Sequence, residues 1–554
     1  MLYVPHSPAA ISGSPLQNHT MKNLPRMHLV LLALLFALSS IHYAASDAVY
    51  DKFVQCLSSH SNTSDQISSI VFSPENPSYK SVLLNYIRNL RFTTAKTPKP
   101  AIIVTPTSEA HVQAAVICAK SNNLLMKVRS GGHDYEGISY ISNGTFIILD
   151  MFNLRAIDIS IADESAIVQA GATLGELYYS IWEKSKVHGF PAGVCPTVGV
   201  GGHVSGGGYG NMLRKYGLTV DHVYDAKIVD VNGRILDRYA MGDLFWAIRG
   251  GGGASFGVIL SYSLKLVQVP ETVTYFRLMK TLAQNATDIV YQWQYAMRKI
   301  DNDLFIRLLL QPVDSDTKGQ KTLRVSFIGN FLGDADRLIN VMSEELPELG
   351  LKKEDCTEMS WIQSMLVWAN FDEGTPPSAF LNRTYDSNFL KRKSDYVKKP
   401  ISKAGLDSIW KKMIALGKTG LVFNAYGGRM SEIPEDETPF PHRAGNLYKI
   451  QYSVNWEDGG IDAESKYLDQ IRQLYSFMTP FVSNNPRESY LNYRDLDIGV
   501  SDNGRNGYNE ALVYGRKYFK GNFDRLVAVK SAVDPDNFFR NEQSIPVQPS
   551  KGNK

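Results

Sequence analysis

The sequence predicts an α+β protein built from two interlocked domains. The chain has 554 residues, of which 44% are hydrophobic and 20% charged, and this length exceeds what one compact core usually holds. From about Pro98, short apolar runs alternate with helical segments, the pattern of an α+β or α/β beginning. Beyond Pro270 the periodicity changes, which indicates a second region.

The first half carries short strands that end in Gly or Pro turns. Residues 101–106 and 124–133 are apolar and strand-like, and residues 111–123 between them have a helical pattern. Farther along, residues 226–237 read as two strands around Asn232-Gly233, a dipeptide typical of a hairpin turn. A cofactor is expected in this half.

The second region is expected to end near Met478. Residues 287–300 are helical in pattern, and residues 323–332 are strand-like. The last segment, from Tyr490 to Ile545, is predicted to return to the first domain. The chain shows no internal repeat and no low-complexity tract.

The charge balance argues against a nucleic-acid partner. Lys and Arg number 58 against 55 Asp and Glu, a formal net charge of +3. Proteins that bind nucleic acid through phosphate neutralisation need a clear cationic excess. No nucleic-acid partner is therefore expected.

Residues 29–38, LVLLALLFAL, have the length of a signal-peptide core and are too short to span a bilayer. Residues 1–46 are therefore predicted to be a leader, and the mature protein is expected to be secreted, with no membrane segment, to an oxidising compartment such as the cell wall or the vacuole. Secretion would make the sequons surface glycosylation sites. They begin at Asn62, Asn143, Asn285 and Asn382.

Glycine-rich segments carry the strongest chemical signal. They are Arg129–Gly137, Cys195–Gly210 and Arg249–Gly257. Glycine lets backbone N–H groups approach an anion without a Cβ in the way, as a pyrophosphate cradle requires. One such run would be read as a tight turn, but three within about 130 residues favour a nucleotide cofactor. No Walker lysine pattern or nicotinamide-type GxGxxG occurs in convincing context, which disfavours nucleotide hydrolysis and NAD binding.

Five motifs in this order resemble the berberine bridge enzyme-like family. They are SGGHDYEG, CPTVGVGGHVSGGGYG, DLFWAIRGGGGASFG, YLNYRDLD and VDPDNFFRNEQSIP. The resemblance runs from about Cys56 to Pro546 and implies a PCMH-type FAD-binding fold of the vanillyl-alcohol oxidase type. It implies an FAD domain of two subdomains at 47–270, an antiparallel-sheet substrate domain with helices at 271–478, a C-terminal segment at 479–547 that packs on the FAD domain, and a tail at 548–554.

The resemblance also implies two covalent bonds to FAD. His133 would bond the 8α-methyl group of the flavin, and Cys195 would bond C6. Without the family, a histidine beside glycines is more often structural, and a lone cysteine before proline is more often an inert core thiol. Cys56 and Cys118 would form a disulfide, which leaves Cys356 as a free, buried thiol. The remaining expected FAD contacts are Arg129, Ser130, Gly131, Gly132, Asp134, Thr197, Val198, Gly199, Gly202, His203, Gly206, Gly207, Gly208, Gly210, Gly257, Val258 and Asn541.

A strand at residues 448–456 is expected to form the catalytic wall. Side chains alternate along a strand, so Lys449, Gln451 and Ser453 share one face. Taken alone, this polar face would be expected to meet solvent. The resemblance places it over the flavin and opposite Tyr493.

Near Tyr493, the charge of Lys449 would lower the tyrosine pKa and make Tyr493 a base for the substrate hydroxyl. Tyr135 and Tyr209 would complete the pocket, although both could equally be ordinary packing aromatics. No metal ligand set is expected.

Two features narrow the expected reaction. Lys449 and Gln451 stand where alkaloid-cyclising relatives carry an acid, so alkaloid cyclisation is disfavoured. Val198 resembles the family's oxygen gate, where a small side chain admits O2. The prediction is an oxidase of a small-molecule alcohol, either an allylic or benzylic alcohol or a carbohydrate hemiacetal, that produces H2O2. Alternatives are a dehydrogenase with another acceptor and a non-catalytic cell-wall glycoprotein.

Overall fold

The computed structural model describes residues 48–61, 67–384, 387–501 and 507–549. The described residues from Phe53 onward form one compact unit. The predicted leader at 1–46 and the sequon asparagine Asn62 lie outside the described residues. In this part of the chain, no helix is both long and apolar enough to cross a membrane.

A mixed sheet opens the compact unit, with strand order β1-β2-β4-β3. Its β2–β4 and β4–β3 pairs are parallel and the β1–β2 pair is antiparallel. The predicted strands at 101–106 and 124–133 appear as β2 and β3, and the predicted helix appears as α4, which Ser108 caps by accepting from the His111 N–H at 3.3 Å. The bounds are α2 Ile67–Ile70, β1 Val71–Phe72, α3 Tyr79–Leu84, β2 Ile102–Val104, α4 Glu109–Ser121, β3 Leu125–Arg129 and β4 Phe146–Asp150.

An antiparallel sheet follows, with strand order β5-β6-β10-β8-β9. The predicted hairpin is confirmed, since β8 pairs with β9 around Gly233 at a φ of +75°. Helix α5 begins with a reciprocal capping box between Thr173 and Glu176. The bounds are β5 Ile157–Ser160, β6 Ser165–Gln169, α5 Leu174–Lys184, β7 His188–Gly189, α6 Val200–Ser205, α7 Leu213–Tyr216, β8 Val223–Val229, β9 Ile235–Leu236, α8 Arg238–Met241, α9 Asp243–Ile248, β10 Val258–Lys265 and β11 Val267–Gln268, which pairs with β7.

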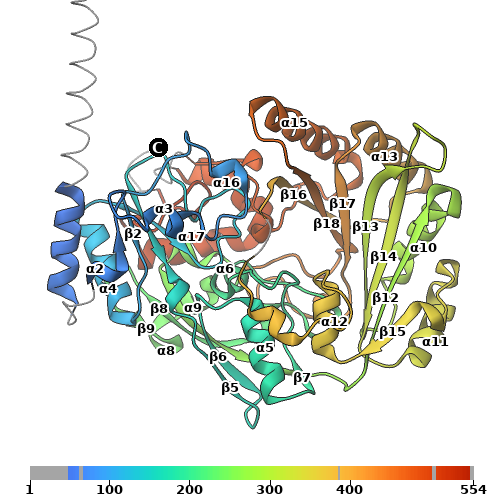
Figure 1. The fold of residues 1–554 in the computed structure, drawn as a ribbon, viewed down its shortest axis with the longest axis horizontal. Coiled ribbons are helices and arrows are strands. Elements are labelled where there is room, and N and C mark those ends of the chain that lie inside the picture. The colour runs from blue at the N-terminus through green and yellow to red at the C-terminus, as the bar shows by residue number, and fades with distance from the viewer. Residues whose placement is uncertain (1–47, 62–66, 385–386, 502–506, 550–554) are drawn as a thin grey trace, which may run out of the picture. The chain divides into compact units, whose positions relative to one another are not determined.

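The large sheet is antiparallel, with strand order β15-β12-β14-β13-β17-β18-β16. Helices α13 and α15 pack on its outer face, away from the first two sheets (Figure 1). The predicted elements at 287–300, 323–332 and 448–456 appear as α10, β14 and β18. The bounds are β12 Val273–Thr281, α10 Ala286–Ala296, β13 Leu304–Asp314, β14 Lys321–Phe331, α11 Ala335–Glu345, β15 Cys356–Met359, α12 Trp361–Trp368, β16 Phe389–Val397, α13 Lys403–Leu416, β17 Gly420–Ala425, α14 Arg429–Glu432, β18 Tyr448–Trp456 and α15 Ile461–Phe477.

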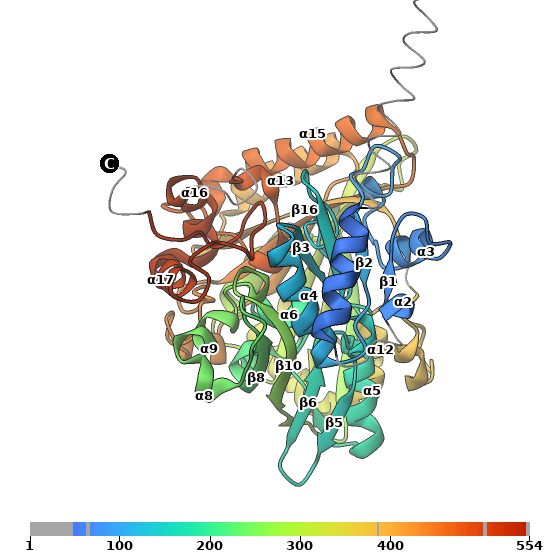
Figure 2. The ribbon, with the colours of Figure 1, turned by 90° about the vertical axis from the view of Figure 1, so that its left-hand side faces the viewer.

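The C-terminal helices α16 (Tyr508–Phe519) and α17 (Phe523–Val533) lie with the first two sheets, where α17 packs against α9 (Figures 1 and 2). The C-terminal segment therefore contacts α9, which lies in the part of the chain that was expected to form the first domain. A continuous apolar core joins the second sheet, the large sheet and the C-terminal helices, and in it the Tyr178 ring of α5 lies 5.5 Å from the Trp361 ring of α12. Residues of the first sheet belong to a separate apolar cluster. The predicted α+β fold is confirmed.

Candidate active site

Two glycine loops meet at the start of the site. A Cβ at Gly131 would overlap the backbone nitrogen of Gly199, and a Cβ at Gly199 would overlap Ser130. Only glycine permits this approach. The contact brings the loop of His133 against the loop of Cys195.

A cavity of about 470 Å³ opens over these loops. Gly202 lines it, and a Cβ added there would meet no atom within 4 Å, so the glycine keeps that part of the cavity open. Most of the predicted site residues line the same cavity. They are Ser130, Gly131, Gly132, His133, Asp134, Tyr135, Cys195, Val198, Gly199, Gly202, His203, Gly206, Tyr209, Gly257, Gln451, Tyr493 and Asn541.

Other predicted contacts lie behind the cavity wall. Arg129 is fully buried and donates to the Leu83 carbonyl at 2.6 Å and to Asp150 at 2.6 Å, which makes it structural. Thr197 lies within 2.9 Å of His133 Nε2. Three glycines of the second loop allow close packing rather than cofactor access: Gly207 against Phe440, Gly208 against Thr219 and Gly210 against Ala192. The predicted residues outside the lining are Arg129, Thr197, Gly207, Gly208, Gly210, Val258 and Lys449.

The two predicted anchor side chains face the same cavity in uncharged forms. Burial, followed by the Arg88 charge, lowers the pKa of His133 to about 3, so its imidazole is neutral near pH 7. Burial raises the pKa of the Cys195 thiol, which Arg307 and Arg392 partly oppose. A neutral imidazole keeps the nitrogen lone pair that a nucleophile needs.

The tyrosines form one cluster. Tyr209 and Tyr493 share a short hydrogen bond between their hydroxyls. The Tyr135 ring lies 5.9 Å from the Tyr493 ring, and Gln451 Nε2 donates to the Tyr135 hydroxyl at 3.2 Å. The sequence missed Tyr490, whose ring lies 5.1 Å from that of Tyr493 and whose hydroxyl accepts from the Gly208 N–H at 3.1 Å.

Lys449 lies under this cluster, completely buried on β18. Its Nζ is 3.2 Å from the Tyr209 ring centroid and 4.6 Å from the Tyr493 ring centroid, so Tyr209 is the nearer partner. The expectation of a lowered tyrosine pKa is wrong: burial, then Tyr209 and Tyr135, raises the pKa of Tyr493 well above its ordinary value. Burial also holds the pKa of Lys449 well below its ordinary value, so burial works against both the phenolate and the ammonium.

The large sheet supplies a polar wall that the sequence did not predict as part of the site. Arg307 of β13 and Asn424 of β17 line the cavity, together with Asn370, which follows α12. Arg307 pairs across strands with Asn424, and Asn424 pairs with Lys449, so Arg307, Asn424 and Lys449 form one row on one sheet face. An arginine inside the apolar run LFIRLLL was a signal for this wall, but its cross-strand partner Asn424 lies more than 100 residues away in the sequence.

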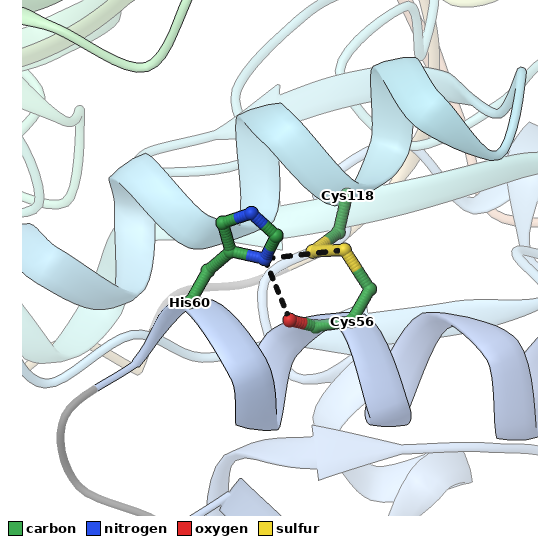
Figure 3. Close-up of side chains that lie close together, drawn as sticks. All are labelled: Cys56, His60 and Cys118. Atoms are coloured by element: carbon green, nitrogen blue, oxygen red, sulfur yellow. Dashed lines mark hydrogen bonds between the residues drawn. A yellow bond between two sulfur atoms is a disulfide. The ribbon is translucent and has the colours of Figure 1, made fainter.

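The predicted disulfide is confirmed. Cys56 and Cys118 are bonded, and His60 Nδ1 lies 3.7 Å from Cys56 Sγ (Figure 3). The two sulfurs and this histidine could resemble a metal cluster, but sulfur held in a disulfide is not a thiolate ligand. Cys356 forms no disulfide, as predicted. It is half-buried rather than buried, because it lies on the edge strand β15, and its pKa is raised to about 11 by burial.

The sequon asparagines within the described part of the chain are all exposed. They are Asn143, Asn285 and Asn382. Their surface positions leave room for a glycan, and glycosylation itself stays a prediction.

The cavity fits a flavin nucleotide: Gly202 leaves part of it open, and a neutral histidine, a thiol, tyrosines and amides line it. These features define the class of FAD-linked oxidoreductases. A model described as FAD binding domain matches residues 100–238, and one described as berberine and berberine like matches residues 489–546.

Relatives that match over nearly their whole length support the same class of protein. Berberine bridge enzyme-like 21 of Arabidopsis thaliana is 61% identical over 518 residues, which cover 93% of this chain and 96% of that protein. The chain belongs to the berberine bridge enzyme-like family.

Solved structures show the same fold. Phl p 4, a grass pollen allergen with glucose dehydrogenase activity, has a TM-score of 0.85 at 41% identity, over 90% of this chain and all of that one. A variant of Phl p 4 described as a glucose oxidase has a TM-score of 0.85 at 42% identity, with the same coverage. Berberine bridge enzyme from Eschscholzia californica has a TM-score of 0.84 at 37% identity, over 90% of this chain and 99% of that one.

Proposed function

We propose that this protein is a secreted oxidase with doubly attached FAD that oxidises an alcohol or a carbohydrate hemiacetal. One observation carries the proposal: His133 and Cys195 face the same cavity as Tyr209 and Tyr493. Bound FAD would accept a hydride from the alcohol carbon at N5, and O2 would then reoxidise the reduced flavin and leave as H2O2.

His133 and Cys195 are the proposed attachment points. The Gly131–Gly199 contact holds their loops together, so one flavin ring could bond both side chains. Thr197 lies within hydrogen-bond distance of His133 Nε2 and fixes the orientation of the imidazole.

The Tyr209–Tyr493 pair is the proposed proton acceptor. The two hydroxyls share a hydrogen bond. A phenolate on either tyrosine would still accept this bond from the hydroxyl of the other tyrosine. Lys449 lies on the Tyr209 ring face and would stabilise the negative charge once protonated. Because the pKa of Tyr493 is raised in the resting site, turnover should increase with pH.

Val198 supports the choice of O2 as the acceptor. It lines the cavity three residues after Cys195, and its small side chain leaves space where a longer aliphatic chain would not. Among the structural relatives, Phl p 4 forms are described both as a glucose dehydrogenase and as a glucose oxidase. A dehydrogenase with another acceptor is therefore the second candidate.

Anaerobic mixing followed by air tests the proposal. The purified protein is mixed with glucose or with an allylic alcohol without oxygen, and flavin absorbance is followed. Bleaching and rapid recovery in air with one H2O2 per flavin support the oxidase. Bleaching with slow recovery, but fast recovery with a quinone dye, favours the dehydrogenase. Unchanged absorbance with every alcohol contradicts both.

A further inference from the structure

His442 is a buried histidine outside the cavity lining, in the segment between α14 and β18. Its Nδ1 lies 2.8 Å from Glu488 Oε2, and its Nε2 lies 3.0 Å from the backbone carbonyl oxygen of Tyr518. A carbonyl oxygen can only accept a hydrogen bond, so Nε2 carries a proton.

The other ring nitrogen of His442 faces an acceptor as well. Lys398 Nζ donates to the second oxygen of Glu488. Burial raises the pKa of Glu488, but the bonds to His442 and Lys398 lower it to about 2, so this carboxylate is ionised near pH 7. An ionised carboxylate only accepts, so Nδ1 also carries a proton. A ring with protons on both nitrogens is an imidazolium.

The surroundings of the ring offset the cost of burying its charge. Burial lowers the pKa of His442, and the hydrogen bond and charge of Glu488 oppose this effect. The Tyr396 ring stacks on the imidazole with centroids 4.2 Å apart and an angle of 17° between the planes, a contact that favours a cation. A neutral ring would turn a nitrogen lone pair towards one of the two acceptors and lose that hydrogen bond. The ionisable groups around the ring are Glu488, Lys398, Lys520 and Tyr396.

His442 lies behind the segment that carries the proposed base. Glu488 comes two residues before Tyr490, whose ring contacts that of Tyr493. The Phe440 ring lies 5.2 Å from the His442 ring and 5.8 Å from the Tyr490 ring. The hydrogen bond to the carbonyl on α16 ties the same segment to the C-terminal helices.

We propose that His442 is an imidazolium in the folded protein and a positioning residue for the segment of Tyr490 and Tyr493. Its charge is inferred from hydrogen bonds alone, whereas its effect on the reaction rests on the proposed function. Loss of the proton would break one of the two hydrogen bonds and loosen the segment. The Tyr493 hydroxyl would then be placed less precisely for proton transfer, and small displacements are costly in rate.

The pH dependence of Tm tests the charge. Tm of the wild-type holoenzyme and of His442→Gln is measured from pH 5 to 9, and the gap between them is followed, since groups such as His203 titrate in both proteins and cancel. Histidine in an unfolded chain has a pKa of about 6.5. A proton that the folded protein holds to higher pH stabilises it fully below pH 6.5, and this contribution is lost as pH rises. We expect the gap to be constant from pH 5 to 6 and to narrow by about half or more from pH 7 to 9.

A neutral His442 gives the opposite trend, in which the gap is constant above pH 7 and narrows as pH falls below about 6.5. That result, or a gap independent of pH, would overturn the inference. Should His442→Gln fail to fold, Glu488→Gln removes the counter-ion and should show the same narrowing from pH 7 to 9. Lys398→Met is the matched control, because it removes the other partner of Glu488 and keeps the bond to His442. Its gap to the wild type should not narrow over this range.

Turnover tests the positioning role. With any alcohol that the protein oxidises, kcat of the wild type should exceed that of His442→Gln about tenfold at pH 7, with KM and flavin content unchanged. The ratio should approach one at pH 9, where the wild type has lost the same proton. Equal kcat values at pH 7 would limit His442 to stability and overturn the positioning role.

Hydrogen exchange separates this inference from the proposed function. If no alcohol is oxidised, the proposed function fails, and backbone amide exchange at pH 7 decides the positioning role instead. His442→Gln should speed exchange in residues 488–495 but not in helix α11, which lies in another part of the chain. Unchanged exchange in residues 488–495 would overturn the inference.

Discussion

Arg494 Nε donates to Asp134 Oδ2 at 2.9 Å, so an ion pair joins the residue after His133 to the residue after Tyr493. These two loops are about 360 residues apart in the sequence. The pair fixes a proposed flavin anchor relative to the proposed base. Such positioning matters because a displacement of about 1 Å can cost two orders of magnitude in rate.

Asp134→Asn should weaken this link without unfolding the loop. Asp134 Oδ1 accepts from the Glu136 N–H at 2.9 Å and the Ile138 N–H at 3.2 Å, and an amide oxygen can still accept both bonds. We expect kcat to fall about tenfold, equal to about 1.4 kcal/mol, with flavin content unchanged. Steady-state turnover gives kcat, and stopped-flow absorbance shows whether the flavin-reduction step slows with it. A lower Tm with unchanged kcat would show that the pair serves stability alone.

Lys391 should be needed for stability. It is buried on β16 and binds both Glu136 and Asp495, the latter at 2.8 Å. Lys391→Met leaves the buried Glu136 carboxylate without its main partner, which should cost about 3 kcal/mol of unfolding free energy. Thermal unfolding measures the loss, and Lys399→Met, at an exposed lysine just beyond β16, should leave Tm unchanged. Equal Tm values for the two variants would contradict this assignment.

Tyr493→Phe removes one hydroxyl of the proposed proton acceptor and keeps the ring. We expect kcat to fall by about 100- to 10,000-fold with the flavin retained. The wild-type rate should rise with pH because deprotonation of the pair is required, and this rise should be lost in the variant. Tyr295→Phe, at an exposed position on α10, is the control. Wild-type turnover in the Tyr493→Phe protein would exclude Tyr493 as the base.

His203 should make the protein sensitive to acid. Burial lowers its pKa from 6.5 to about 3, and the Gly193 N–H donates to its Nε2 at 3.2 Å, a bond that needs an unprotonated ring. Since the unfolded chain takes up the proton first, stability is complete above pH 6.5 and decreases as pH falls towards 3. The loss should be about 1.4 kcal/mol per pH unit. Tm measured from pH 7 to 4.5 should fall less steeply in His203→Gln, while exposed His60→Gln keeps the wild-type slope. Parallel slopes for the wild type and His203→Gln would refute this account.

Much of the fold could be predicted because its signals are local. The helix at Glu109–Ser121 and the hairpin around Gly233 follow from periodicity and from one turn dipeptide. The active-site motifs were recognisable because the glycine loops leave a distinctive pattern. These signals depend on neighbours within a few residues.

The rest of the site depends on contacts between distant residues. Arg307 joins the site through its cross-strand neighbour Asn424, and strand order cannot be read from either segment alone. The direction of the Tyr493 pKa shift was mispredicted because burial depends on the whole fold. Proximity of Lys449 suggested a stabilised phenolate, whereas burial of both groups outweighs that attraction.

The most direct test of the account is the mass and colour of acid-precipitated protein. After deglycosylation, the wild type should give a yellow pellet with the mass of one chain plus one FAD. His133→Ala and Cys195→Ala should each keep the flavin through the other bond, and the double variant should release it. A colourless wild-type pellet at the mass of the polypeptide alone would contradict the doubly attached flavin.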